Sequence, residues 1–496
     1  MYRPSKKEFE KLLKNGYSVE MWKEIPAGGE TPVSAYLKLG SSQYSCLLES
    51  IEGEEKFARY SFLAIDPFFV FKSSGTAAIV QEYRGGRTGS STKKIFKSDD
   101  PLKLLKSYIS EIKLKPNGFA LPRLAGGTIG YIAYDYVKKI EKIESAKKPG
   151  IGLPELFFIF PRIVVAFDHL KQKVKIIRLV NTREKTSYKS ACRDIEDIIR
   201  KLKDPILIET HRSEMGAVKS NIEKNDFKKS VLKAKQYIKN GDIIQVVLSQ
   251  RLGVRFDGET FEIYRALRLL NPSPYMYYFN FGNLKIIGSS PEILVRLENN
   301  SAILRPIAGT RPRGKDTPED KKLETELLRD EKERAEHLML VDLGRNDLGR
   351  VCRFGSIKLK KFMTIEKYSH VMHIVSEVAG LLNKNAGAFE LFRATFPAGT
   401  VSGAPKIRAM EIIEELEPTE RGLYAGAVGY FDYRGNMDFA INIRTIIVKD
   451  KNAYIQAGAG IVADSVPEKE YEETLNKARA MLKAIEMAAN KVVSGW

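Results

Sequence analysis

Two pairs of glutamates, each spaced three residues apart, are the side chains in this 496-residue sequence best suited to chemistry. Glu333 and Glu336 form the first pair, and Glu470 and Glu473 form the second. Residues three apart lie on one face of a helix, so two such helices facing each other would present four carboxylates to one cavity. That much negative charge is costly to desolvate, and a hard divalent cation, Mg²⁺ above all, would offset it. The spacing predicts a metal-dependent enzyme that acts on an anionic substrate.

Each glutamate pair taken alone also fits a salt-bridged helix surface. A glycine-rich run at 458–463 changes the balance: it matches a dinucleotide fingerprint, but only one helix follows it, so we interpret it as a turn whose backbone N–H groups approach an anion. The run 399–406 fails the phosphate-loop spacing and suits anion binding and a plain helix start equally well. A lone histidine such as His373 is usually a packed core residue, but beside these features it is a candidate for the same site.

The composition is that of a soluble globular protein, with 43% hydrophobic and 29% charged residues. The chain start lacks the apolar core of a secretory signal, and no apolar run is long enough to span a bilayer. Three cysteines without metal or disulfide spacing fit a reducing compartment, so we expect the cytoplasm. The net charge of +19 raises nucleic-acid binding as a rival function. The lysine clusters are far apart, however, so we expect neither nucleic acid nor membrane as a partner.

The elements that must position these residues fall into two predicted regions. Residues 1–205 are mostly strands with a few helices, residues 206–222 form a polar connector, and residues 223–489 carry the glutamate pairs. In the second region we predict one helix over 318–342 and another over 468–489. Strands in runs and helices in blocks favour the α+β class with mostly antiparallel sheets. The pattern leaves open whether the regions are separate domains or one interleaved sandwich.

Further motifs are distributed along the second region, at 244–251, 288–292, 305–314, 336–347, 371–373, 396–406, 443–445 and 457–465. On these motifs nearly the whole chain resembles the chorismate-utilising enzymes and, within that family, the large subunits of anthranilate synthases. The resemblance implies two large, mostly antiparallel sheets packed as a sandwich with helices outside. It also implies a lyase that converts chorismate and ammonia to anthranilate and pyruvate, the first committed step of tryptophan biosynthesis. Ammonia would attack ring carbon C2 while the C4 hydroxyl leaves, and loss of pyruvate would make the product aromatic.

The same resemblance assigns roles to individual residues. Glu336 and Glu473 would bind Mg²⁺ directly, with Glu333 and Glu470 behind them through water. The chorismate contacts that it implies are Gly309, Thr310, Tyr424, Arg444 and the backbone of Gly458, Ala459 and Gly460. An arginine suits one of the two substrate carboxylates because it can donate bidentately. His373 would lie beside the reacting ring, either as a proton donor or acceptor or as an orienting group, so the implied catalytic residues are His373, Glu336 and Glu473.

Two positions separate this chain from relatives within the family. Isochorismate and salicylate synthases, which add water, place a lysine where this chain has Gln245. Aminodeoxychorismate synthases place a nucleophilic lysine where this chain has Ala308. Both differences favour anthranilate as the product, and an aminodeoxychorismate synthase is the nearest alternative.

Regulation and a partner are also implied by the resemblance. Ser50 and the run Pro274, Tyr275 and Met276 match segments that bind tryptophan in feedback-inhibited members, although an ordinary contact between the regions is the alternative. No cysteine lies in a glutaminase turn. Glutamine-dependent activity therefore needs a separate glutamine amidotransferase subunit, which we expect in a heterotetramer.

Overall fold

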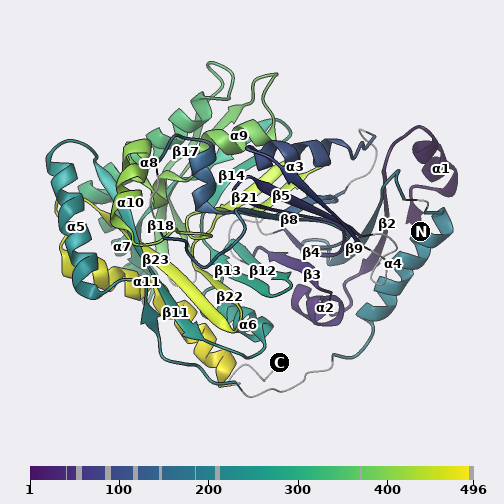
Figure 1. Ribbon diagram of the computed structural model, residues 1–496, viewed down its shortest axis with the longest axis horizontal. Helices are drawn as coiled ribbons and strands as arrows, with labels where there is room; N and C mark the ends of the chain where they lie inside the picture. Colours follow the sequence, from purple (N-terminus) through teal and green to yellow (C-terminus); the bar gives the residue numbers. More distant parts are fainter. Residues whose placement is uncertain are drawn as a thin grey trace.

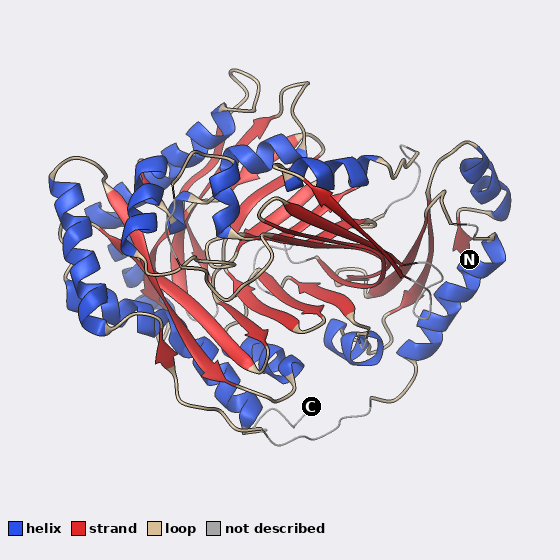
Figure 2. Ribbon diagram, viewed as in Figure 1, coloured by secondary structure: helices blue, strands red, loops and turns tan. Residues whose placement is uncertain are grey.

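The computed structural model describes residues 1–40, 42–51, 59–83, 91–115, 121–144, 148–184, 186–206, 213–368 and 371–490 (Figure 1). These residues form two antiparallel sheets that face each other, with helices around them. Figure 2 shows the strands inside and most helices at the rim. Among the described residues, no helix is both long and apolar enough to cross a bilayer.

The first sheet runs from the N-terminal strands to the strands that follow the connector. Its order is β1 (Tyr2–Arg3), β2 (Val19–Pro26), β9 (Lys173–Val180), β8 (Leu156–Asp168), β4 (Tyr60–Ser74), β3 (Tyr44–Glu49), β12 (Tyr275–Phe281), β13 (Leu284–Ser290), β22 (Thr445–Lys449), β23 (Asn452–Ile461) and β11 (Gln245–Arg255). Two short strands, β10 (Lys219–Ser220) and β19 (Gly403–Ala404), pair with β11. All of these pairings are antiparallel.

The second sheet shares β4 and β8 with the first. Its order is β6 (Ser91–Lys97), β5 (Ala77–Tyr83), β4, β8, β7 (Gly127–Ile132), β20 (Ala427–Asp432), β21 (Met437–Ile441), β14 (Ile293–Glu298), β15 (Ser301–Leu304) and β18 (Val371–Leu381). Two further strands, β16 (Ile307–Pro312) and β17 (Lys358–Lys367), also pair with β18. These pairings are antiparallel as well.

The two shared strands turn from one sheet into the other at a break in their pairing. The register of β4 against β8 shifts between Pro67 and Phe69, and Asp66 beside the break has φ +53°. Strands that change sheets through a bulge form the corner of a sandwich. Apolar side chains from both sheets fill the space between them, as in the stacked rings of Phe157 and Phe281, 4.1 Å apart. The predicted α+β sandwich is confirmed.

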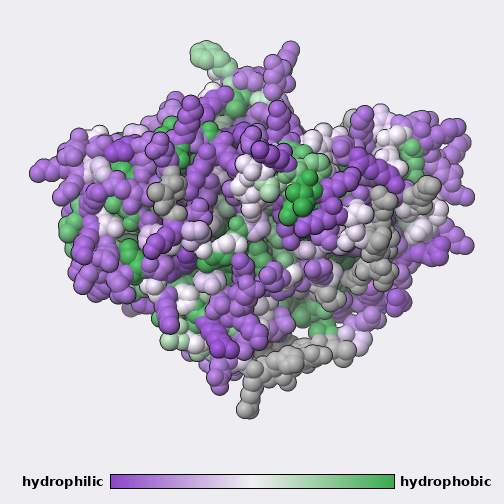
Figure 3. All heavy atoms as spheres, viewed as in Figure 1, coloured by the Kyte–Doolittle hydropathy of each residue, from purple (hydrophilic) through white to green (hydrophobic). Residues whose placement is uncertain are grey.

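Helices cover both outer faces of the sandwich. Those on the first sheet are α1 (Lys6–Lys14), α2 (Pro32–Leu39), α4 (Tyr188–Leu202), α6 (Thr260–Leu270), α11 (Pro467–Ala489), α5 (Lys224–Lys239) and α10 (Lys406–Leu416). Those on the second sheet are α3 (Pro101–Ser110), α7 (Thr317–Arg329), α8 (Glu331–Gly349) and α9 (Ala388–Thr395). The face drawn in Figure 3 is mostly hydrophilic, and hydrophobic residues are scattered over it in small groups.

Strands from the two predicted regions pair with one another in both sheets. Strand β3 pairs with β12, and β7 pairs with β20. Residues 207–212 of the predicted connector lie outside the described residues. The N-terminal part therefore completes the sheets that carry the candidate site.

Candidate active site

The first glutamate pair lies at the start of α8, where we had predicted the middle of one helix over 318–342. That prediction was wrong, because α7 ends at Arg329 and α8 begins at Glu331. Asp330 separates them: its carboxylate accepts the backbone N–H groups of Lys332 and Glu333, both at 3.1 Å. An aspartate at this position satisfies first-turn donors that a continuous helix would bond internally. The break places Glu333 and Glu336 on the first turns of a new helix that packs on β16 and β18.

The second pair lies on the first turns of α11, close to where the sequence predicted a helix. Glu473 forms a 2.6 Å ion pair with Lys477, one turn further along. The Lys477 ammonium also donates to the carbonyl of Gly458 at 3.0 Å. Lys477 thus connects the acidic face of α11 to the glycine-rich end of β23, a role that no motif in the sequence indicates.

The two acidic pairs are close enough to interact with the same charged side chains. Burial raises the pKa of Glu336, and the charge of Glu333 raises it further. Burial also raises the pKa of Glu470, while Lys332 and Lys477 lower it. The same two lysines lower the pKa of Glu336. Because both lysines act on both helices, α8 and α11 bring their carboxylates to a common region.

Oxygen donors with raised pKa values are the kind of group that a divalent cation would stabilise as anions. Lys477 already brings a positive charge there, between a carboxylate and a carbonyl oxygen. In the described ranges, no three His, Cys, Asp or Glu side chains converge closely enough to hold a metal by themselves. Mg²⁺ usually keeps several waters and takes one or two carboxylates plus substrate oxygens. The glutamates of α8 and α11 therefore fit Mg²⁺ when water and substrate oxygens complete its coordination.

His373 is held in a defined orientation on β18. It stands opposite Thr310 of β16, and its Nδ1 lies 3.0 Å from the carbonyl oxygen of Gly309 and 3.1 Å from the Thr310 hydroxyl. Because a carbonyl oxygen can only accept a hydrogen bond, Nδ1 carries the ring proton and donates a hydrogen bond to Gly309. Nε2 is then the basic nitrogen of the neutral ring. Burial lowers the pKa of His373, and the charge of Arg444 lowers it as well.

Gly309 connects this histidine to the acidic pair. Its φ is +68°, which favours glycine, and it lies at an irregularity in the β16–β18 pairing. A methyl group there would lie 3.3 Å from the Glu333 carboxylate and 3.0 Å from Leu327. The part of β16 that contacts His373 and the start of α8 are therefore in close contact.

The glycine-rich end of β23 presents an open backbone edge. Residues Gly458, Ala459 and Gly460 pair with β11, but β22 pairs with β23 only as far as Ile455. Alternate N–H groups along the uncovered edge point away from β11. The Ala459 side chain is fully buried, so only its backbone is available to a ligand.

Both glycines allow close approach by polar side chains. A methyl group at Gly458 would lie 2.6 Å from the Tyr424 hydroxyl, and one at Gly460 would lie 2.6 Å from the Gln245 amide nitrogen. Burial raises the pKa of Tyr424 to about 12, so its hydroxyl stays protonated. The backbone edge, a phenol and an amide thus lie together.

Arg444 lies among these groups. Its guanidinium donates to the backbone carbonyl of Lys477 at 2.7 Å, and its own carbonyl accepts the N–H of Ser289 at 3.1 Å. It has φ +51°, an unusual conformation for a residue other than glycine. Burial lowers its pKa, while Tyr424 and Glu473 raise it. A half-buried guanidinium beside an open row of N–H groups can bind a carboxylate.

Glu292 is a further candidate that the sequence analysis quoted only within a motif. Burial raises its pKa to about 8, and the neighbouring Thr400 hydroxyl lowers it only in part. It lines a cavity of about 50 Å³ with Thr400, Asp347 and Arg305. A carboxyl that stays protonated at neutral pH can donate a proton, but sequence alone does not reveal its burial.

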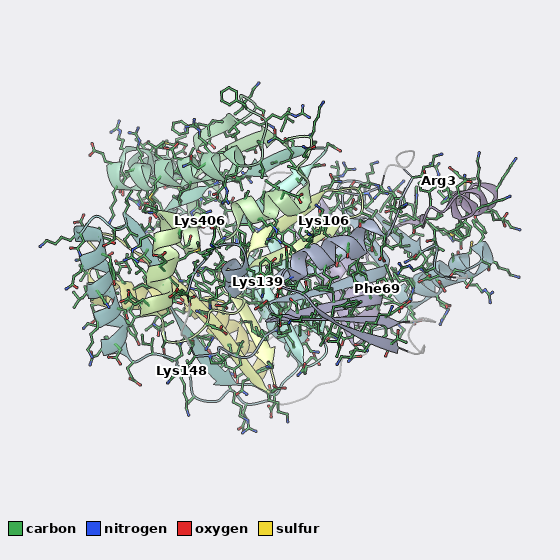
Figure 4. The ribbon with its side chains drawn as sticks, turned by 45° about the horizontal axis from the view of Figure 1, so that its top comes forward. Arg3, Phe69, Lys106, Lys139, Lys148 and Lys406 are labelled. Atoms are coloured by element: carbon green, nitrogen blue, oxygen red, sulfur yellow. The ribbon has the colours of Figure 1, made fainter. Side chains whose placement is uncertain are left out.

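The 399–406 run has a structural role that the sequence left undecided. Lys406, labelled in Figure 4, begins α10, and its ammonium bonds both carboxylate oxygens of Asp347 at 2.9 and 2.7 Å. This ion pair joins α10 to α8, so the Lys406 charge is already matched.

The residues predicted to bind tryptophan lie together, away from the acidic pairs. Ser50, Pro274, Tyr275 and Met276 line one cavity of about 40 Å³ between the two sheets. The Tyr275 hydroxyl donates to Asp438 at 2.9 Å. Two segments more than two hundred residues apart therefore form one wall, because β3 and β12 are neighbours.

Comparison with known proteins identifies the family. The family model for chorismate binding enzymes matches residues 46–483. Anthranilate synthase component 1 of Acetivibrio thermocellus is 49% identical over 98% of this chain and 99% of its own, and that of Aquifex aeolicus is 48% identical over 98% of each. The crystal structure of anthranilate synthase component I from Streptococcus pneumoniae superposes with a TM-score of 0.75 at 38% identity, covering 92% of this chain and 98% of that one. The chain therefore belongs to the family of chorismate binding enzymes.

Proposed function

We propose that this protein converts chorismate and ammonia to anthranilate and pyruvate in tryptophan biosynthesis. The observation that carries the proposal is the convergence of Arg444, His373 and the open edge of β23 beside the two acidic pairs. A dicarboxylate substrate needs cationic and N–H donors at one end and charge neutralisation at the other. The near full-length similarity to proteins named anthranilate synthase component 1 supports the same activity.

The chain's own residues supply binding and proton transfer. Arg444 and the N–H groups of the β23 edge hold one substrate carboxylate, and Tyr424 packs against that edge. His373 keeps Nε2 available because Nδ1 donates to the Gly309 carbonyl.

Mg²⁺ is the cofactor that we propose for the acidic pairs. Glu336 and Glu473 would hold it directly, and Glu333 and Glu470 would act through water. When bound, its two positive charges would offset part of the negative charge of the glutamates and of a substrate carboxylate. Glu473 would then exchange its bond to Lys477 for the metal.

The product depends on two positions next to the site. Gln245 lies beside Glu336 and Gly460, where it can donate a hydrogen bond but cannot act as a strong base. Ala308 precedes Gly309 on β16 and offers no nucleophile. Ammonia is therefore favoured over water or a lysine as the attacking group, which supports anthranilate over aminodeoxychorismate.

Two further parts of the proposal concern supply and control. The name component 1 of the relatives indicates a second component for them, and we propose a separate glutamine amidotransferase that delivers ammonia to this chain. We also propose that tryptophan binds between Ser50 and Tyr275 and inhibits the reaction.

The test is anthranilate fluorescence with purified protein, chorismate, Mg²⁺ and ammonium. We expect turnover with ammonium and none with glutamine, loss of turnover with EDTA, and inhibition by tryptophan. Glu470→Gln should raise the Mg²⁺ concentration needed for half-maximal rate, whereas Glu472→Gln on the exposed side of α11 should not. Consumption of chorismate without anthranilate emission would contradict the proposed product. Full turnover in EDTA would contradict the metal.

A further inference from the structure

A partly buried polar cluster next to His373 has no part in the proposed reaction. Glu366 on β17 stands directly opposite His373 on β18, so their side chains share one face of the sheet. Arg305 forms an ion pair with Glu366, and the Tyr368 hydroxyl donates to Glu366 at 3.0 Å. The Tyr368 ring lies 5.7 Å from the imidazole ring and is tilted by 60°. Arg305, Glu366 and Tyr368 together are called the hairpin cluster below.

The hairpin cluster forms part of the partition between two cavities. Arg305 lines the cavity that contains Glu292, and it also lines a second cavity of about 20 Å³. Tyr368 lines this second cavity too, across from Ser50 and Tyr275. Two of the residues predicted to bind tryptophan, Ser50 and Tyr275, therefore share a cavity with Tyr368, the residue that packs on His373.

The wall on the tryptophan side is held firmly. The Tyr275 hydroxyl donates to Asp438 and accepts from Arg296 at 3.1 Å, and Arg296 forms an ion pair with Asp438 at 2.9 Å. The carboxylate and the guanidinium are almost completely buried. Close-packed protein interiors transmit small displacements. Tyr275 and Tyr368 line a cavity of only about 20 Å³, which a shift of the Tyr275 ring would close, so a ligand that displaces Tyr275 would press on Tyr368.

The groups that face His373 set its orientation from three sides. The Gly309 carbonyl and the Thr310 hydroxyl contact Nδ1 from β16. Arg444 acts on its charge from the loop before β22. Glu366 faces it from β17, and Tyr368, directly after β17, both packs on the ring and lines the second cavity.

We propose that Glu366 and Tyr368 are positioning residues for His373, and that with Arg305 they transmit tryptophan binding to it. The inference rests on the proposed function. With the tryptophan cavity empty, the Tyr368 ring holds the imidazole so that Nε2 faces the substrate. Tryptophan displaces Tyr275, the displacement reaches Tyr368, and the imidazole leaves its productive orientation. Inhibition then lowers kcat more than it raises KM for chorismate.

Tyr368→Phe tests this because it keeps the ring and removes the bond to Glu366. We expect kcat to fall about three- to tenfold, the effect of one hydrogen bond, with the KM for chorismate within about twofold. At saturating tryptophan the fraction of activity that remains should be at least fivefold higher than in the wild type, while the tryptophan Kd from calorimetry stays within about twofold. Tyr237→Phe is the matched control, since it removes a 2.7 Å bond to Glu415 on the exposed side of α5. It should change neither quantity.

A readout that does not depend on anthranilate separates the two proposals. The chain has five histidines, so the imidazole NMR signal of His373 can be assigned with a His373→Gln variant. Tryptophan should shift this signal in the wild type and not in Tyr368→Phe. Equal shifts in both proteins, or equal losses of tryptophan binding and inhibition, would overturn the inference. A wild type without anthranilate production would overturn the proposed function, while the NMR comparison would still decide the coupling.

Discussion

Adding one methyl group at Gly458 is the perturbation whose effect can be worked out most directly. The new carbon would lie 2.6 Å from the Tyr424 hydroxyl, 2.9 Å from the Leu248 carbonyl oxygen and 3.1 Å from Val247. Ordinary contact begins at 3.4 Å, so the phenol is about 0.8 Å too close. Tyr424 is buried with its ring 5.3 Å from the Arg421 guanidinium, and Leu248 belongs to strand β11, where its side chain is buried. Neither can move away freely.

The expected cost of Gly458→Ala has two parts. Overpacking of this kind destabilises a fold by about 1–3 kcal/mol. A displacement of about 1 Å in a group that faces the substrate costs on the order of 100-fold in rate. We therefore expect kcat/KM for chorismate to fall about 100-fold, with a small decrease in Tm.

Steady-state anthranilate fluorescence and thermal unfolding measure these two parts separately. Gly349→Ala is the control, because a methyl group at the end of α8 meets nothing within 4 Å and should leave kcat/KM within about twofold. Gly460→Ala should cost less than Gly458→Ala, about tenfold, since its methyl group meets the terminal amide of a side chain, Gln245, and not backbone. A Gly458→Ala enzyme within threefold of the wild type, or an equal loss in Gly349→Ala, would refute the reasoning.

Three other predictions follow from the site, the core and the tryptophan cavity. Arg444→Lys should raise KM for chorismate about 10- to 100-fold, because a lysine cannot donate bidentately, and steady-state kinetics would contradict this if only kcat changed. His337 is buried against Ser376, and burial lowers its pKa from 6.5 to about 4. Between these values the unfolded chain binds more protons, so the free energy of unfolding should decrease by about 3 kcal/mol in total as the pH is lowered from about 6.5 to about 4. Urea unfolding should find this loss absent in His337→Gln. Ser50→Phe should fill the cavity of about 40 Å³ and weaken tryptophan inhibition at least tenfold, with turnover within a few-fold; unchanged inhibition in the fluorescence assay would remove the tryptophan site.

The features that the sequence predicted well are periodic. Glu470 and Glu473 lie on α11, which begins within one residue of the predicted start, because the helical spacing and Pro467 at the first turn are local signals. The antiparallel α+β sandwich is also as expected. The break at Asp330 was missed because the glutamate-rich pattern continues through it, and only the bonds to Lys332 and Glu333 reveal the cap.

What the sequence could not give is the burial and pairing of charged groups between distant elements. Lys477 looks like any surface lysine of a helix, and its bond to Gly458 exists only because α11 packs on β23. Glu292 follows a short turn motif, and its raised pKa results from the surrounding cavity wall. Lys406 suggested an anion site until Asp347 of α8 was found beside it. Such contacts depend on three-dimensional packing, which no local pattern encodes.

The arrangement of Lys477 and the glutamates should couple the binding of Mg²⁺ to the binding of chorismate. Within the described residues no three acidic or metal-binding side chains converge tightly, so without substrate Mg²⁺ would have few protein ligands. It would also have to displace Lys477 from Glu473. Chorismate without Mg²⁺ would bring its second carboxylate near carboxylates whose charge is already unfavourable. Each ligand therefore removes the main cost of binding the other, and linkage requires that the effect be reciprocal. We expect calorimetry to show that chorismate tightens Mg²⁺ binding by the same factor as Mg²⁺ tightens chorismate binding, and independent affinities would contradict a shared site.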